Sequence, residues 1–257
     1  ALRWLLAGGA VTGGLLPMVG CGGGGDDAGS TTNSSSSSTT TTSCSLIPEE
    51  TAGPYPGDGS NTANGSVANA LALSGIVRSD IRSSIAGASG TASGIPLTIT
   101  ITLVNTNGSC ASLDGYAIYL WHCDALGRYS MYSSGVTNQN HLRGVQSTSS
   151  SGQATFVTIF PGCYSGRMPH MHFEVYRSTT TATSFSNKLR TSQIAFPNAT
   201  SSAVYATSGY TGSASNLAAI SFSSDNIFSD GYSTQLASIS GDTSNGYTAT
   251  LQVGIAV

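Results

Sequence analysis

The sequence predicts an all-β fold of the sandwich type, and three observations lead to this class. Apolar and polar residues alternate with a period of two in several segments, which is the pattern of a strand with one buried face. Clusters of Gly, Ser, Asn and Asp separate these segments and favour turns between them. Outside residues 1–21 the chain shows no strong helical periodicity and no internal repeat. Short strands joined by turns are typical of a β-sandwich.

Residues 1–21 are predicted to be an export signal. An apolar stretch over 4–18 follows Arg3, and small residues precede Cys21. This ending resembles a bacterial lipobox, so we expect Cys21 to be the lipidated first residue of the mature protein. The protein would then be extracytoplasmic, in the periplasm or at the cell surface, with lipidated Cys21 as its membrane attachment. A retained membrane helix is the alternative, although the glycines and Pro17 weaken it.

Residues 22–43 are predicted to be a disordered linker. They are rich in Ser, Thr and Gly and include an unbroken Ser/Thr tract from Ser34 to Thr42. Such a segment cannot bury enough apolar area to offset the entropy lost when its backbone is ordered. We therefore expect a tether followed by one folded domain over residues 44–257.

The strands of that domain are predicted from the alternation. In 97–103 apolar residues alternate with threonines, and 247–255 shows a similar alternation. Further segments with strand character lie at 71–77, 116–122, 153–160, 168–176 and 190–196. The stretch 200–224 is rich in loop-forming residues, and a short helix is expected around Ser213 to Ala219.

The composition excludes one class of partner and supports a single core. Charged residues make up 8% of the chain and the net charge is −3, which provides no electrostatic footprint for nucleic acid. Hydrophobic residues make up 39%, so the part after the linker can bury one core.

Four cysteines follow Cys21, at positions 44, 110, 123 and 163. Because the chain is predicted to be exported, up to two disulfides are expected, and the sequence leaves all three pairings open. The cysteines lack close Cys-x-x-Cys spacing, so no metal role is expected for them. Cys163, next to Tyr164, is a candidate for a bridge that stiffens its loop.

A pair of histidines in the run Pro169-His170-Met171-His172-Phe173 is the strongest sign of chemistry. A strand sends alternate side chains to one face, so both imidazoles lie on the same face, about 6.5 Å apart along the backbone. Met171 and Phe173 occupy the other face, as in a strand that packs on a core. The pair therefore has the spacing of two metal ligands; two surface or hydrogen-bonded histidines are the alternative.

Tyrosines stand near this pair and narrow the choice of metal. Tyr164 lies in a Pro- and Gly-rich loop just before the histidine strand, and Tyr129 follows a turn after Trp121. A phenol, with a usual pKa of about 10, becomes a ligand only beside a strongly Lewis-acidic ion. Phenolate oxygens with imidazoles suit Fe(III) better than Cu(I), Ca²⁺ or Zn²⁺. The residues therefore indicate a non-haem Fe(III) site.

Five short motifs lie in a characteristic order: Thr51-Ala52-Gly53-Pro54-Tyr55, Leu120-Trp121-His122-Cys123-Asp124-Ala125 with Gly127 and Tyr129, Leu142-Arg143-Gly144, Pro161-Gly162-x-Tyr164, and Gly166-Arg167-x-x-His170-x-His172. Their order and spacing resemble those of the intradiol ring-cleavage dioxygenases, a family that includes the catechol and protocatechuate enzymes. The resemblance covers most of residues 44–257.

The resemblance implies a fold, a site and a reaction. The fold is a mixed β-sandwich of the immunoglobulin-like or prealbumin-like kind, with long loops that build the metal site. The implied Fe(III) ligands are Tyr129, Tyr164, His170 and His172. Arg167 would face the substrate ring, and Gln193 would line the pocket. A catechol-type diol would displace Tyr164, which can accept a substrate proton, and O2 would open the ring to a muconate-type product without an external reductant.

The resemblance does not determine the substrate, and it gives no role to several tyrosines and histidines. Many members of the family carry a second tyrosine where this chain has Pro56 after Tyr55, so the identity of the catechol is left open. Tyr55 and Tyr132 are candidate pocket walls, and a core or surface role is the alternative. His122 and His141 are expected outside the site. The oligomeric state is also left open.

Two other function classes remain open. One is a surface-anchored β-sandwich lipoprotein that binds a ligand but has lost catalysis, which the linker and the Ser/Thr-rich surface would suit. The other is a zinc or copper hydrolase or oxidase that uses His170 and His172 with a water molecule, although no His-Glu-x-x-His motif is present. Glu174, the one acid on the histidine face, is expected behind the ligands or facing solvent.

Overall fold

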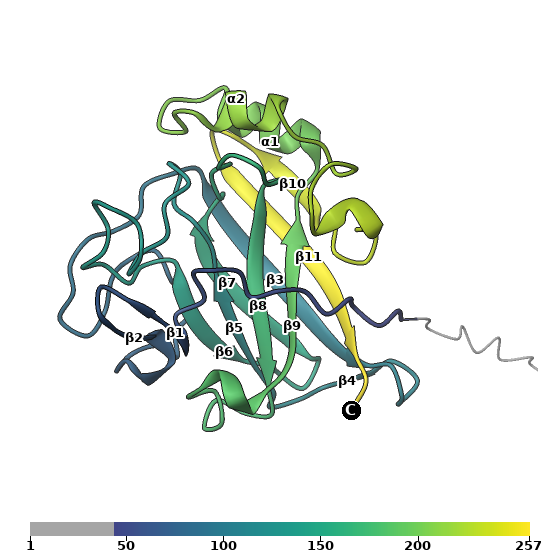
Figure 1. Ribbon diagram of the computed structural model, residues 1–257. Helices are drawn as coiled ribbons and strands as arrows, with labels where there is room; N and C mark the ends of the chain where they lie inside the picture. The colour runs from purple at the N-terminus through teal and green to yellow at the C-terminus, as the bar shows by residue number, and fades with distance from the viewer. Residues whose placement is uncertain (1–43) are drawn as a thin grey trace, which may run out of the picture. The chain divides into compact units, whose positions relative to one another are not determined.

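The structure, a computed structural model, describes residues 44–257 (Figure 1). The predicted export signal, the lipidation of Cys21 and the linker over 22–43 lie outside the described residues. Within 44–257, no helix has the length and apolarity needed to cross a bilayer.

Two β-sheets form the main body of the described chain. The four-stranded sheet has the order β6 (Arg143–Ser147), β5 (Ala117–Trp121), β8 (His170–Tyr176) and β9 (Lys188–Ala195), and all its neighbours are antiparallel. The other sheet contains β10 (Ser238–Asp242), β11 (Gly246–Ile255), β3 (Pro96–Asn105), β4 (Ala111–Ser112) and β7 (Gln153–Ile159). Its central pair, β11 and β3, is parallel, which makes this sheet mixed.

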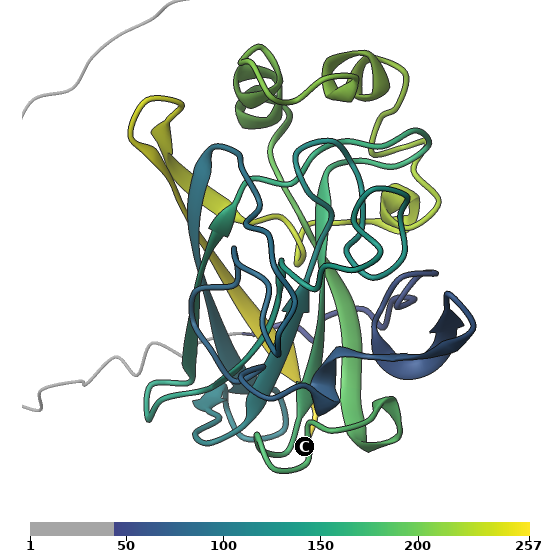
Figure 2. The ribbon, with the colours of Figure 1, turned by 90° about the vertical axis from the view of Figure 1, so that its left-hand side faces the viewer.

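The side view in Figure 2 separates β3 and β11 from β8 and β9 as two layers. Their facing side chains form one buried cluster, to which β3 contributes Leu97, Ile99, Ile101 and Leu103 and β8 contributes Met171, Phe173 and Val175. Burial of these apolar side chains is the main favourable term for a core of this kind. The predicted all-β sandwich is confirmed.

Smaller elements surround the sandwich. The two-stranded sheet consists of β1 (Asp58–Ala63) and β2 (Ser66–Asn69), and three short 3-10 helices are η1 (Ala70–Ala72), η2 (Phe185–Asn187) and η3 (Phe228–Asp230). Helices α1 (Asn198–Tyr205) and α2 (Ser213–Ala218) lie at one end of the sandwich (Figure 1). The predicted short helix near Ser213 is therefore confirmed as α2.

The strand predicted over 71–77 is wrong. The chain forms η1 there and then a turn, in which the N–H of Ile76 donates to the carbonyl of Leu73 at 3.2 Å. Gly75 has φ +85°, a left-handed conformation that interrupts an extended strand. Alternation of apolar residues alone does not detect this turn.

The expectation of up to two disulfides is met by one bridge. Within 44–257, Cys44 and Cys110 form one disulfide, while Cys123 and Cys163 are buried free thiols. A bridge at Cys163 is therefore wrong. The thiol of Cys163 instead donates to the carbonyl of Arg167 at 3.4 Å, so the loop is closed by hydrogen bonding.

Candidate metal centre

The site begins with one row of residues across the four-stranded sheet. Arg143 pairs with Trp121, Trp121 with His172, and His172 with Gln193. Directly opposed residues of neighbouring strands share a face. The indole of Trp121 stacks on the imidazole of His172, with ring centres 5.0 Å apart and an interplanar angle of 7°.

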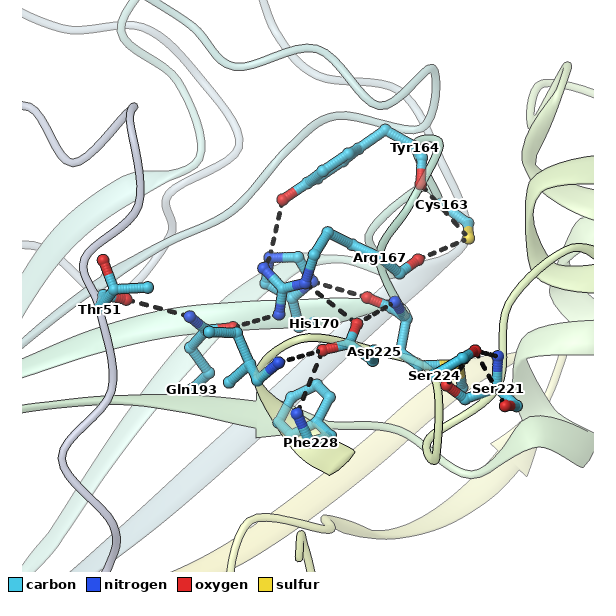
Figure 3. A network of polar contacts seen from close by, with 12 residues as sticks. Thr51, Cys163, Tyr164, Arg167, His170, Gln193, Ser221, Ser224, Asp225 and Phe228 are labelled. Carbon is cyan, nitrogen blue, oxygen red and sulfur yellow. Dashed lines mark hydrogen bonds and ion pairs between the residues drawn. The ribbon is translucent and has the colours of Figure 1, made fainter. Parts of the chain in front are cut away.

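Two loops bring tyrosines to this face. The hydroxyl of Tyr129 lies 3.2 Å from Nε2 of His172 and 3.5 Å from Nε2 of His170. The hydroxyl of Tyr164 lies 3.0 Å from Nε2 of His170 (Figure 3). The two Nε2 atoms are 3.1 Å apart. These four atoms, called the donor cluster below, converge on one point.

The loop before Tyr129 is shaped by Asp124 and Gly127. The carboxylate of Asp124 accepts hydrogen bonds from the backbone N–H groups of Leu126 and Arg128, both at 2.9 Å. Gly127 has φ +77°, and a Cβ at this position would lie 3.0 Å from Cβ of Tyr164. A glycine is therefore needed for the two tyrosine loops to pack together.

The histidines have the protonation expected of metal ligands. Nδ1 of His170 hydrogen-bonds the carbonyl of Met168 at 2.6 Å, which leaves the Nε2 lone pair facing the donor cluster. Burial lowers the pKa of His170 to about 3. Burial and the adjacent His170 lower the pKa of His172 well below its usual value. Both imidazoles are therefore neutral at neutral pH.

The phenols need a cation before they can ionise. Burial raises the pKa of Tyr164 to about 12, and burial together with Tyr164 raises the pKa of Tyr129 well above its usual value. Only a strongly Lewis-acidic ion in contact with the oxygens would bring them to the phenolate form near neutral pH.

The spacing of the donor cluster fits a single bound metal. Ligand bonds of about 2.1 Å separate two donor atoms by about 3.0 Å at a right angle and by about 3.4 Å at the tetrahedral angle. The four separations given above run from 3.0 to 3.5 Å. Over 44–257, no group of three or more His, Cys, Asp and Glu side chains is arranged to hold a metal, so a four-donor site here requires the phenols.

Arg167 stands at the edge of the donor cluster, with Nη1 at 3.3 Å from Nε2 of His170. Its Nη2 donates to Oε1 of Gln193 at 2.6 Å, and Gln193 in turn donates to the carbonyl of Thr51 at 3.0 Å (Figure 3). The predicted residues Arg167 and Gln193 thus lie together beside the four predicted donors.

Asp225 is a residue of this network that the sequence analysis missed. Its carboxylate is fully buried and lies 3.0 Å from Nε of Arg167. It comes from a segment distant in sequence from Arg167, and nothing in its local sequence marks it as different from other loop aspartates. Only the tertiary structure brings the two charges together.

The ring of Tyr55 lies beside Tyr129, and a buried arginine holds the segment that contains Tyr55. The ring of Tyr55, 37% exposed, has its centre 5.0 Å from Tyr129 and 5.4 Å from Tyr132. Arg143 is buried and donates to the carbonyls of Tyr55 at 2.9 Å and Pro56 at 2.7 Å. The segment containing Tyr55 is therefore fixed over the site.

Three other residues considered from the sequence lie apart from the donor cluster. His122 hydrogen-bonds Thr158 at 2.7 Å, and the two ring nitrogens of buried His141 have no hydrogen-bond partner. The solvent-facing option for Glu174 is wrong, because its carboxylate is fully buried and accepts from Tyr176 at 2.6 Å.

The fold and this geometry define a β-sandwich with a two-phenol, two-imidazole site. A family profile described as Dioxygenase matches residues 78–201. An intradiol ring-cleavage dioxygenase from Tetranychus urticae is similar in structure, with 27% identity, a TM-score of 0.62, and coverage of 83% of this chain and 95% of that one. A second dioxygenase crystal structure gives 27% identity, a TM-score of 0.63 and the same coverages of 83% and 95%.

The dioxygenase domain of a dioxygenase and carbohydrate-binding fusion protein from Streptomyces sp. SirexAA-E shares the fold, with 21% identity, a TM-score of 0.51, and coverage of 83% of this chain and 99% of that one. The comparison with curated proteins found no match. By its profile match over residues 78–201 and by its structure, the chain is similar to the intradiol ring-cleavage dioxygenases.

Proposed function

We propose that this protein is a non-haem Fe(III) dioxygenase that cleaves a catechol-type ring between its two hydroxyl-bearing carbons, with O2 as co-substrate. The single observation that carries the proposal is the donor cluster, in which each phenol oxygen lies 3.0 to 3.5 Å from an imidazole nitrogen and the two imidazole nitrogens are 3.1 Å apart. Tyr129, Tyr164, His170 and His172 would hold the ion. When bound there, a ferric ion would supply the Lewis acidity that favours an ionised diol and prepares its ring for O2.

Tyr164 is the residue that would make room for the substrate. Its side chain is half-buried, whereas Tyr129 is 1% exposed and is held by a hydrogen bond from its N–H to Ser133 at 2.9 Å. Because Tyr164 is less buried than Tyr129, its hydroxyl is the one that would turn outward. As a phenolate it would take up one proton from a diol hydroxyl at its own oxygen.

Arg167 would stabilise negative charge on the substrate. A guanidinium is charged at any working pH and donates in a fixed, planar arrangement. Its position 3.3 Å from Nε2 of His170 lies beside the place that the Tyr164 hydroxyl would leave. Gln193 orients the guanidinium, and the rings of Tyr55 and Tyr132 would contact the flat face of an aromatic diol.

Iron loading and ring cleavage test this proposal directly. Residues 44–257, produced with iron, should absorb visible light through phenolate-to-Fe(III) charge transfer and consume O2 when catechol is added. With ¹⁸O2, the product should be a ring-opened diacid that carries both labelled atoms. Protein that binds no iron would favour the surface-anchored binding lipoprotein instead, and a product labelled by a single atom would exclude the proposed reaction.

We also propose an extracytoplasmic location with attachment through Cys21. The Cys44–Cys110 disulfide supports an oxidising compartment, because such bonds are rare in the cytosol. Full-length protein should partition into detergent, and Cys21→Ser should remove the lipid mass and release it. An unmodified Cys21 in the mature protein would contradict the anchor.

A further inference from the structure

Three contacts hold the guanidinium of Arg167, and each comes from a different part of the chain. Nη2 donates to Gln193 on β9, Nη1 approaches His170 on β8, and Nε donates to Asp225 in the segment before η3. The ring of Phe228 lies below, 5.8 Å from the guanidinium carbon. Figure 3 shows Asp225 on the side of Arg167 away from Tyr164.

The carboxylate of Asp225 is itself rigidly held. One oxygen accepts from the backbone N–H of Met168 at 2.7 Å as well as from Arg167 at 3.0 Å. The other accepts from the N–H groups of Ile227 at 2.8 Å and Phe228 at 3.1 Å. Four donors around a fully buried carboxylate leave it no alternative orientation.

This arrangement determines where the charge of Arg167 lies. An arginine side chain has many rotamers of similar energy, so an unsupported guanidinium would sample many positions. Once Nε is fixed by Asp225, the planar group must direct Nη1 toward the donor cluster and Nη2 toward Gln193. The buried carboxylate also balances a positive charge that would otherwise oppose a metal cation nearby.

We propose that Asp225 is a positioning residue for substrate: it fixes the Arg167 guanidinium at the edge of the donor cluster and thereby sets the affinity for an ionised aromatic diol. The proposal rests on the proposed function. Asp225 lies outside residues 78–201, the part that the family profile matches. The assignment therefore depends on the contacts of this chain.

A double-mutant cycle on iron-loaded protein tests the proposal. The variants are Asp225→Asn, Arg167→Met and the double variant, with Asp80→Asn as control, because Asp80 forms an exposed ion pair with Arg82. The readouts are iron content, the Kd of 4-nitrocatechol from its absorbance change, and kcat and KM for catechol. We expect Asp225→Asn to retain iron and to raise the Kd of 4-nitrocatechol about tenfold. The double variant should bind 4-nitrocatechol no more weakly than Arg167→Met alone.

The proposal would be overturned if Asp225→Asn weakened nitrocatechol binding as much in the Arg167→Met background as in the wild type. Wild-type affinity in Asp225→Asn would overturn it as well. If Asp225→Asn does not fold, Arg167→Lys decides the matter. Lysine keeps the charge but cannot occupy the Nε and Nη positions together, so it should bind nitrocatechol as weakly as Arg167→Met. Wild-type affinity in Arg167→Lys would refute positioning.

Binding and turnover separate this inference from the proposed function. Wild-type protein that binds iron and nitrocatechol but leaves catechol uncleaved would refute the proposed function alone. The double-mutant cycle on the Kd of nitrocatechol would then still test the role of Asp225. Wild-type protein that binds neither iron nor nitrocatechol would refute both.

Discussion

Replacing Tyr164 with phenylalanine removes one oxygen from the donor cluster and nothing else. The hydroxyl lies 3.0 Å from Nε2 of His170, and the ring is half-buried on its loop. Loss of one hydrogen bond of this kind costs about 1 kcal/mol, which lowers the Tm of a domain this size by about 2–4 °C. We therefore expect a folded variant.

The effect on turnover should be far larger. A positioned proton acceptor contributes about 10²–10⁴-fold to a rate. Arg167 stays 3.3 Å from His170 and continues to stabilise negative charge, so the expected loss in kcat for Tyr164→Phe is at the lower end, about 10²-fold. Iron should be retained, because Tyr129, His170 and His172 remain.

The assay compares two tyrosine-to-phenylalanine variants. Tyr205 is buried and donates one hydrogen bond, to the carbonyl of Pro161 at 2.9 Å, outside the donor cluster. Tyr205→Phe should lose similar stability and keep the kcat of the wild type. Oxygen uptake at saturating catechol, iron content and the visible band are measured for each. If iron-loaded Tyr164→Phe retains more than half of the wild-type kcat, the role of Tyr164 as proton acceptor is wrong.

Four further predictions concern stability and metal. Cys110→Ser removes a bridge over a sequence separation of 66 residues and should lower the free energy of unfolding by about 4 kcal/mol in denaturant titrations; an unchanged midpoint would contradict this. Gly127→Ala places a Cβ 3.0 Å from Cβ of Tyr164 at a residue with φ +77°, so the iron content of this variant should fall. The control is Gly65→Ala, because Gly65 has a similar φ of +80° but its added Cβ meets no neighbouring atom. Full iron loading of Gly127→Ala would contradict this prediction. Burial would raise the pKa of Asp225, but the N–H groups of Met168 and Ile227 and the Arg167 charge lower it below 3.8 overall. The stability from Asp225 is therefore present above pH 3.8 and lost as pH falls further, so Asp225→Asn should lower the Tm less at pH 3 than at pH 6 in thermal scans. Chelation of iron should remove the visible band and lower the Tm, because a metal that binds only the folded state stabilises it; an unshifted Tm would place the iron elsewhere.

The fold class and the donor residues could be predicted because both depend on local patterns. Alternation identified the strands at β3, β5, β7, β8, β9 and β11, and His-x-His on a strand places two imidazoles on one face by geometry alone. The tyrosines were found through their motifs. The structure brings all four side chains to one point, and their role as ligands stays a prediction.

Other features depend on pairings that no local pattern encodes. The side chain of Gln193 reaches the site because it is opposite His172 in the β8–β9 register. Asp225 is close to Arg167 only through the long connection that contains α1 and α2. The disulfide pairing likewise depends on which strands are neighbours, and Gly75 ended a segment whose apolar pattern resembled a strand.

The four side chains of the donor cluster differ in how firmly they are held, and this difference suits ligand exchange. His170 and His172 lie on a strand between β5 and β9, and Tyr129 is buried. Tyr164 alone is half-buried, yet its Cβ is packed against Gly127. Because its loop is packed against Gly127 and its side chain is the least buried of the four, we expect exchange by rotation of the side chain rather than by movement of the loop. Three fixed donors would then keep the ion in place while the fourth position passes to the substrate.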